Sequence, residues 1–152
     1  MFDDNVKLQT IGDVSHWNTI SLIDAGGWLN ECSSFVGDNT GTMDLSGWNT
    51  RNLKAAGEMF LRTNIQVIDL SGWTFDSITN EKWKGAGRGI YYETSNDAES
   101  YKGLGGMFHG SKNLKAVYIF QSGLDSYNAA VEREVNILDM WKGSKCKGFT
   151  VK

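Results

Sequence analysis

The chain has no proline and only two cysteines among its 152 residues, which limits how its fold is held together. Without proline, its bends must depend on 18 glycines and on Asn, Asp and Ser. We expect Cys32 and Cys146 to lie at opposite ends of the structure as reduced, partly buried thiols. A chain of this length buries about two thirds of its unfolded surface, so one domain over 1–152 needs neither disulfides nor a metal.

Long apolar runs and strong charge are also missing. No apolar run approaches the ~20 residues that span a bilayer, which argues against membrane insertion. The net charge of -3 gives no reason to expect a nucleic-acid partner. The first residues, Met1–Lys7, lack the basic head and apolar core of a secretion signal. The chain is then a fragment, stays where it is made, or leaves the cell inside an assembly such as a phage particle.

Residues arranged for catalysis are not evident either. The two histidines, His16 and His109, have no metal-type partner at helical or strand spacing. The glycine-rich stretch Lys84–Gly89 lacks the residue order of a phosphate-binding loop. No nucleophile elbow and no Cys–His pair can be argued from spacing. We therefore expect no enzyme, no cofactor and no metal site.

A repeated phrase is the main positive feature. Met43–Thr50, with the sequence MDLSGWNT, returns 25 residues later as Ile68–Phe75, IDLSGWTF, and a looser earlier copy is Gly12–Thr19, GDVSHWNT. Repetition at this period predicts a stack of similar small units, which is more typical of binding surfaces than of enzymes.

A hydrophobic pair recurs in each unit, as Trp28-Leu29, Met59-Phe60, Met107-Phe108 and Met140-Trp141. The spacings between pairs exceed the base period, which indicates insertions near 36–41, 81–103 and 121–128. The units are then approximately 11–41, 42–66, 67–115 and 116–152.

Hydrophobic periodicity predicts the elements of each unit. Alternation in Met43–Ser46 and Ile68–Ser71 predicts strands with one buried face, and Gly148–Val151 a last, exposed edge strand. Spacing in Asn52–Leu61 predicts a helix. A second helix is expected along one stripe, started by Asp125 or Ser126 and ended by Gly143; the stripe is Tyr127, Val131, Val135, Leu138 and Trp141. The predicted fold is α/β, a short solenoid of about four units with a mostly parallel sheet of about five strands and helical crossovers.

The repeated phrase resembles the BspA-like leucine-rich repeats. The matching positions are Leu45, Ser46, Trp48, Thr50, Leu53, Met59-Phe60, Leu70, Ser71, Trp73, Met107-Phe108, Gly110 and Leu114, with Cys32 at the family's cysteine position. The resemblance covers roughly Gly12–Phe120, and it departs from the family where Trp28 replaces the expected Met. The resemblance implies a leucine-rich-repeat-like scaffold. Members of that family are typically bacterial surface proteins, so it also implies a surface protein that takes part in adhesion.

Three aspartates form one candidate site. Alternation places Asp13, Asp44 and Asp69 on the outward face of the sheet beside Ser15, Ser46 and Ser71. Carboxylates on strands about 4.8 Å apart would crowd one another. They hold a cation or an amine ligand, or each bonds to a neighbouring backbone N–H or serine hydroxyl on a solvated face. We favour the second interpretation.

The insertion near 81–103 is the other candidate site. Its aromatic and basic residues are of the types that dominate interface hot spots and carbohydrate stacking; they are Trp83, Arg88, Tyr91, Tyr92 and Tyr101. The alternative is that Ile90–Tyr92 adds a short strand or fills the core. The tryptophans of the repeated phrase, Trp17, Trp48 and Trp73, are expected to stack as a structural column.

Together these features predict a non-enzymatic module that binds a protein or a glycan through its repeat face and the insertion. The alternative is a structural or decoration protein of a bacteriophage virion or another large assembly, with other subunits as partners. The family resemblance favours a bacterial cell surface, whereas the missing secretion signal favours the virion.

Overall fold

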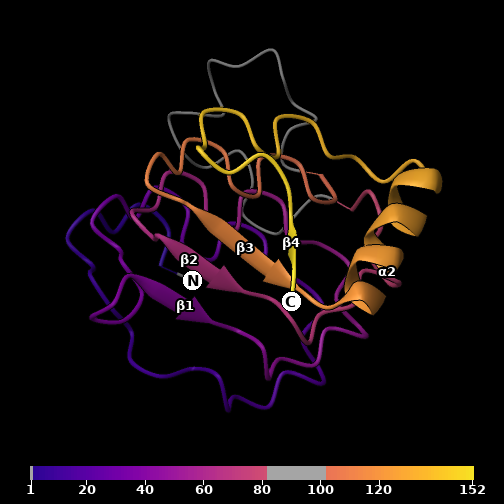
Figure 1. Ribbon diagram of the computed structural model, residues 1–152, viewed down its shortest axis with the longest axis horizontal. Helices are drawn as coiled ribbons and strands as arrows, with labels where there is room; N and C mark the ends of the chain where they lie inside the picture. Colours follow the sequence, from indigo (N-terminus) through magenta and orange to yellow (C-terminus); the bar gives the residue numbers. More distant parts are fainter. Residues whose placement is uncertain (1, 82–101) are drawn as a thin grey trace.

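The computed structural model describes residues 2–81 and 102–152, and its strands form one parallel sheet. The sheet has the order β1 (Thr42–Asp44), β2 (Val67–Asp69), β3 (Ala116–Ile119) and β4 (Thr150–Val151), so neighbours in the sheet follow one another along the chain (Figure 1). One helix, α2 (Gln121–Glu132), is found in these residues, beside the carboxyl end of β3. The described chain is therefore an α/β protein.

The strands lie where alternation in the sequence predicts them. Met43 pairs in register with Ile68, and Ile68 with Val117, and all three side chains are buried on one face. Asp44 and Asp69 pair in register on the other face. The placement of the strands within the repeated phrase is confirmed.

The expectation of about five strands is wrong for the described residues, because Gly12–Thr19 contains no strand. The turn before β1 explains the difference. Asp38 donates its backbone N–H to the Thr42 carbonyl oxygen (2.8 Å), and its Oδ1 accepts the Thr42 N–H (2.9 Å). These bonds occupy the backbone groups of Thr42 that a further strand beside β1 would need.

The helix expected over Asn52–Leu61 is also wrong. This segment contains turns, and the positive φ angle of Glu58 within it, 56°, is one that an α-helix cannot contain; Arg62, directly after it, has a φ of 55°. Its alternate N–H groups bond across to another segment. Glu58 N–H donates to the Gly105 carbonyl (2.8 Å) and Phe60 N–H to the Met107 carbonyl (2.9 Å). Four segments bond in this way, and we call them the turn ladder: 25–31, 55–61, 103–110 and 136–142.

The turn ladder aligns the repeated hydrophobic pairs. Leu29 N–H donates to the Met59 carbonyl (2.9 Å), and Phe108 N–H to the Met140 carbonyl (3.0 Å). The rings of Phe60 and Phe108 are stacked with centroids 5.8 Å apart, and Phe108 stacks on Trp141 at 4.6 Å. Residues far apart in sequence therefore meet because they hold equivalent positions in their copies.

The C-terminal helix begins earlier and ends earlier than its apolar stripe predicts. α2 covers the proposed insertion near 121–128, and Ser126, instead of capping its start, accepts the Phe75 N–H (2.9 Å). After Arg133 the chain leaves the helix, with a φ of 63° at Glu134. Residues 136–142 then belong to the turn ladder. The second half of the predicted apolar stripe, from Val135 to Trp141, therefore lies outside the helix.

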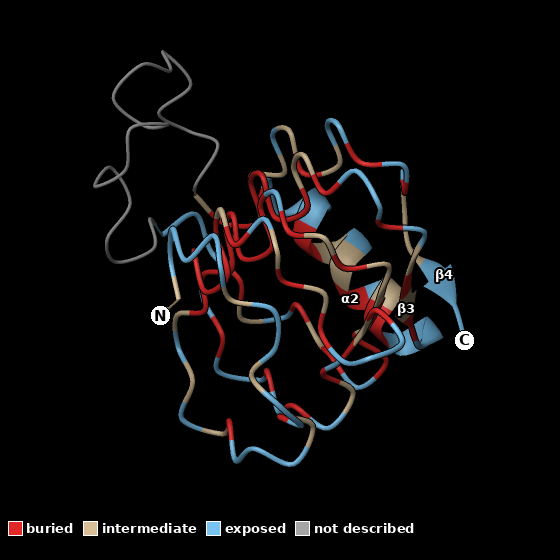
Figure 2. Cartoon of the chain, turned by 90° about the vertical axis from the view of Figure 1, so that its left-hand side faces the viewer, coloured by how far each residue is buried: buried red, intermediate tan, exposed pale blue. Residues whose placement is uncertain are grey.

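The core lies between the sheet and the turn ladder. Buried residues gather in the interior, whereas β4 is exposed (Figure 2). Cys32 and Cys146 are both buried free thiols, as expected. The Cys32 thiol donates to the Phe2 carbonyl (2.8 Å), and burial raises its pKa.

Candidate functional site

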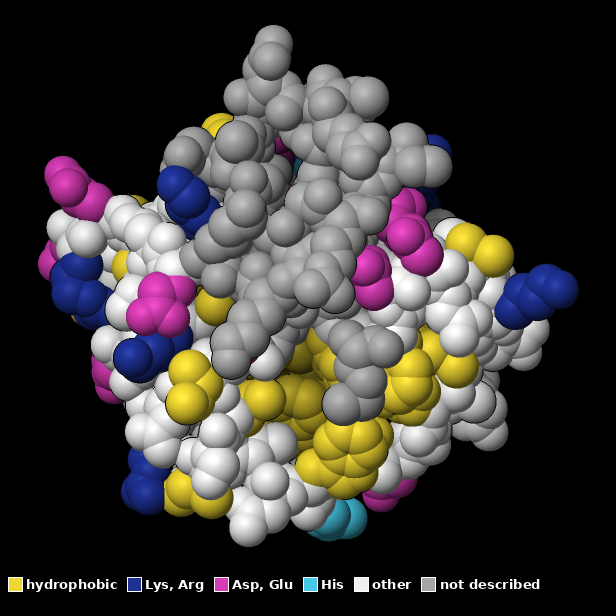
Figure 3. All heavy atoms as spheres, turned by 180° about the vertical axis from the view of Figure 1, so that it is seen from behind, with side chains coloured by type: hydrophobic (Ala, Val, Ile, Leu, Met, Phe, Trp, Pro, Cys, Tyr) yellow, Lys and Arg dark blue, Asp and Glu magenta, His cyan; other side chains and the backbone are white. Residues whose placement is uncertain are grey.

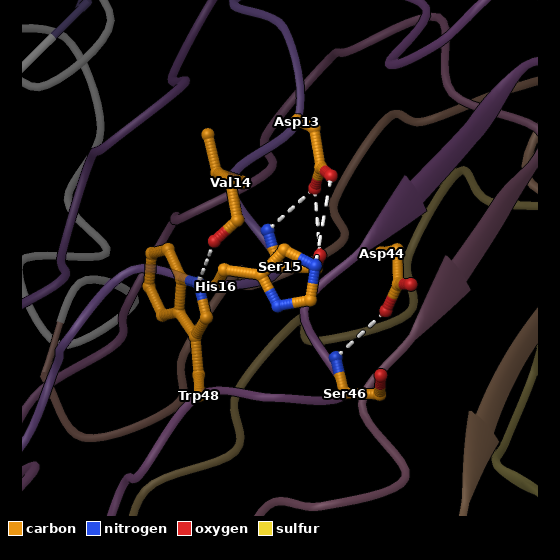
Figure 4. Close-up of polar contacts among 7 residues, drawn as sticks. All are labelled: Asp13, Val14, Ser15, His16, Asp44, Ser46 and Trp48. Carbon is orange, nitrogen blue, oxygen red and sulfur yellow. Dashed lines mark hydrogen bonds and ion pairs between the residues drawn. The ribbon is translucent and has the colours of Figure 1, made fainter.

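The three aspartates of the predicted site accept hydrogen bonds from groups of this same chain. Asp13 Oδ1 accepts both the N–H (2.9 Å) and the hydroxyl (2.7 Å) of Ser15, and Asp44 Oδ1 accepts the Ser46 N–H (2.9 Å), as Figure 4 shows. The Ser15 hydroxyl and N–H lower the pKa of Asp13. Both aspartates therefore form the bonds that the second interpretation describes, and whether this face also binds a ligand stays a prediction.

Asp69 is bound twice. Its Oδ1 accepts the Ser71 N–H (2.9 Å), and its Oδ2 accepts the Lys152 ammonium at 2.7 Å. The amine at this aspartate is thus supplied by the chain itself. Within residues 2–81 and 102–152, no three His, Cys, Asp or Glu side chains gather in a way that could hold a metal ion.

The insertion site cannot be placed. Trp83, Arg88, Tyr91, Tyr92 and Tyr101 lie outside the described residues. Their role in binding stays a prediction.

The tryptophan column is confirmed, and its end is open. The rings of Trp17 and Trp48, and those of Trp48 and Trp73, are stacked with centroids 6.3 Å apart and planes within 13°. Trp48 and Trp73 are 4% and 2% exposed, but Trp17 is 43% exposed. The column therefore ends in a half-exposed indole.

A cleft of about 540 Å³ opens beside Trp17. Figure 3 shows the face hidden in Figure 1, where hydrophobic side chains gather around a hollow. Trp17, Trp28 and Trp48 form the aromatic part of the cleft, and Trp28 contacts Trp17 edge-on at 6.2 Å. The remaining lining residues are Asn18, Thr19, Ser21, Leu22, Asp24, Ala25 and Gly26.

Among the described lining residues, Asp24 is the charged one. Its Oδ1 accepts the Gly26 N–H (2.9 Å), and its backbone forms a parallel bridge with Ala55. Both contacts fix the carboxylate relative to the tryptophans. The cleft thus combines an open aromatic face with a positioned carboxylate, an amide and hydroxyls, which are groups that orient a bound molecule.

Sequence reasoning missed this cleft because it favoured a packing role for the tryptophans over a role in ligand binding. Two signals pointed to it. Trp17 lies in the loosest copy of the phrase, and Trp28 stands where the repeat has Met. Both departures from the repeat lie at the cleft.

The fold and the site define an α/β protein with a parallel sheet and an aromatic cleft at the first copy of its repeated phrase. Residues 1–84, more than half of the chain, match the family described as "Mycoplasma protein of unknown function, DUF285", and the chain belongs to that family. No curated protein and no solved structure matches the chain.

This membership corrects the resemblance to BspA-like leucine-rich repeats, which is contradicted by the family match. The resemblance depended on a few repeated positions spread over roughly Gly12–Phe120, and such a pattern describes a local strand and turn geometry rather than ancestry. Placement at a cell surface or in a virion stays a prediction. In the part of the chain that the structure describes, no helix has the length and apolar character needed to cross a lipid bilayer.

Proposed function

We propose that the chain is a non-enzymatic binding module that recognises a protein or a glycan, and that the cleft beside Trp17 is its site. The observation that carries this proposal is the exposure of Trp17, at 43%, in a column whose other members are buried. Leaving a large aromatic surface in water gives up the stabilisation that burial provides. Exposed aromatic surface beside a cleft is typical of an interaction site.

The proposal includes a short repeat solenoid of about four units as the scaffold. Its support is the register of equivalent residues, both in the strands and in the turn ladder. In such a stack an inner unit is covered on both sides, whereas an end unit keeps one side open. Among the described residues, Trp17 has a neighbouring copy of the phrase on one side only, which agrees with its exposed indole.

The chemistry of the cleft also supports binding. The described lining offers an indole face, the Asn18 amide, the Ser21 hydroxyl and the Asp24 carboxylate. These groups form hydrogen bonds and stacking contacts without any change in covalent bonding.

The test is a binding screen with matched variants. Biotinylated protein, assembled on labelled streptavidin to raise avidity, is applied to arrays of oligosaccharides and of 15-residue peptides. We expect at least one class to bind the wild type and the variant Leu138→Ala, whose exposure of 43% equals that of Trp17. The same class is expected to lose binding to Trp17→Ala. Binding that Trp17→Ala retains in full, or no binding to either array, would contradict the proposal.

The assembly alternative has one observation in its favour, the exposed edge of the sheet at β4. Val151 in β4 is 45% exposed, and Phe120, directly after β3, is 48% exposed. An open strand edge with apolar neighbours can pair with another chain. Light scattering separates the two functions: the binding module predicts a monomer of 16.9 kDa. A defined oligomer that Val151→Lys dissociates would favour the assembly component.

A further inference from the structure

Resting on the proposed function, we infer that the ligand of the cleft is a neutral carbohydrate, with one sugar ring stacked on the open face of Trp17. The inference begins with the tryptophan column. Trp48 is stacked between two indoles, each with its centroid 6.3 Å away. Trp17 has such a neighbour only toward Trp48 among the described residues, so a flat apolar ring on its other face continues the column.

The indole N–H groups give the second argument. Trp48 Nε1–H donates to the Val14 carbonyl (2.9 Å), and Trp73 Nε1–H donates to the Leu45 carbonyl (3.1 Å). Each bond reaches back to the preceding copy of the phrase. Within the described chain, Trp17 Nε1–H has no equivalent acceptor. A sugar supplies both missing contacts, because its C–H face stacks on an aromatic ring and its hydroxyl oxygens accept hydrogen bonds.

The polar rim distinguishes a sugar from an apolar side chain of a protein. Asn18, Ser21 and Asp24 lie beside the three tryptophans in the lining. An apolar side chain in the cleft would cover the Asn18 amide and the Ser21 hydroxyl without replacing their hydrogen bonds to water, which is costly. A polyhydroxylated ring instead bonds to both groups while its apolar face covers the indole.

Charge narrows the class to neutral sugars. The described lining contains no lysine or arginine that could pair with an acidic sugar or a phosphate. A quaternary ammonium ion is bound best when several aromatic faces surround it. Trp28 and Trp48 are only 6% and 4% exposed, so Trp17 alone presents an open face. A neutral sugar ring stacks on a single aromatic face, whereas a quaternary ammonium ion is bound best by several aromatic faces.

The experiment uses the full chain on one array that carries neutral oligosaccharides, acidic oligosaccharides, alkylammonium groups and peptides. We expect neutral oligosaccharides to bind, with little change between 50 and 500 mM NaCl because no ion pair is formed. Trp17→Ala is expected to weaken this binding by at least about tenfold, as for other aromatic stacking contacts. Trp17→Phe, which keeps a ring but lacks the N–H donor, is expected to bind with intermediate strength. Leu138→Ala is expected to bind like the wild type.

Thermal unfolding of each variant shows whether it is folded; a Trp17→Ala chain that unfolds early is replaced by Ser21→Met, which fills the cleft from its exposed rim. Binding of peptides, acidic sugars or alkylammonium groups through Trp17 would overturn the carbohydrate assignment and leave the proposed function standing. Binding that no cleft variant weakens would overturn both.

Discussion

Gly47 and Gly72 decide how closely successive copies of the repeated phrase approach. A Cβ atom at Gly47 would lie 2.2 Å from the Ser15 carbonyl oxygen, and one at Gly72 would lie 2.0 Å from the Ser46 carbonyl oxygen. The first copy has His16 at this position, and its side chain is exposed. Glycine therefore stands where a preceding copy packs, and a larger residue stands where none does among the described residues.

Gly72→Ala is expected to destabilise the protein by about 2 kcal/mol or more, because the new methyl group overlaps backbone that cannot easily move. Chemical denaturation measures the change. Gly148→Ala is the matched control, since a Cβ there meets no atom within 4 Å. Equal stability of the two variants would show that the copies are not packed as described.

Asp69 and Lys152 make the second contact at this scale that titration can test. Partial burial acts to raise the pKa of Asp69, but the hydrogen bonds from Lys152 and Ser71 outweigh it and hold that pKa below its ordinary value. Asp69 in turn raises the pKa of Lys152. A carboxyl group whose pKa is lower in the folded state stabilises the fold above its unfolded pKa, and the effect is lost as the pH falls through the folded pKa.

Lys152→Gln is therefore expected to be less stable than the wild type at pH 7, and the difference is expected to shrink at acid pH, as the pH falls through the lowered folded-state pKa of Asp69. Denaturant midpoints at pH 7 and at acid pH measure it. Lys145→Gln, which removes an exposed lysine from the same terminal region, is the control. A difference that does not change with pH would contradict the ion pair.

At the scale of elements, α2 is joined to the sheet through small residues. Gly123, Ser126 and Ala130 form its buried face. A Cβ at Gly123 would lie 2.8 Å from the Trp73 carbonyl oxygen and 2.6 Å from Ile119 Cγ1. The helix thus packs against the end of the tryptophan column through a residue that contributes poorly to helix stability.

Gly123→Ala tests this packing because helix propensity and packing have opposite signs. In an exposed helix the change would gain about 1 kcal/mol. Here we expect a loss of about 1–3 kcal/mol from the steric overlap. The exposed helix position Asn128→Ala is the control and is expected to gain a few tenths of a kcal/mol. A more stable Gly123→Ala protein would place α2 farther from the sheet.

The strands could be predicted from sequence, whereas the crossovers could not. Alternation identified β1 and β2 because residues such as Met43 and Ile68 bury one face only. The apolar spacing of 52–61 is the same in a helix and in the turn ladder, since both bury one side. The difference lies in backbone conformation, with positive φ at Glu58, a residue type that gives no sign of it.

At the scale of the whole molecule, the repeat predicted which residues meet but not where the cleft opens. The column of Trp17, Trp48 and Trp73 follows from equivalent positions in three copies. The cleft lies beside the first copy, where no further copy packs among the described residues, and a repeat pattern describes only what recurs. Asp13, Asp44 and Asp69 were predicted to share one face of the sheet. In the structure each carboxylate accepts a hydrogen bond from the backbone N–H of the serine two residues later.

The central claim is that a ligand completes the tryptophan column at Trp17. The most direct test is a two-dimensional NMR spectrum of the indole N–H groups of the six tryptophans, recorded with and without neutral oligosaccharides. The Trp17 signal is identified by its loss in Trp17→Phe. The account predicts that the sugar shifts the Trp17 signal and leaves that of Trp73, 2% exposed, in place. A Trp17 signal that no sugar, peptide or alkylammonium compound moves would contradict the account.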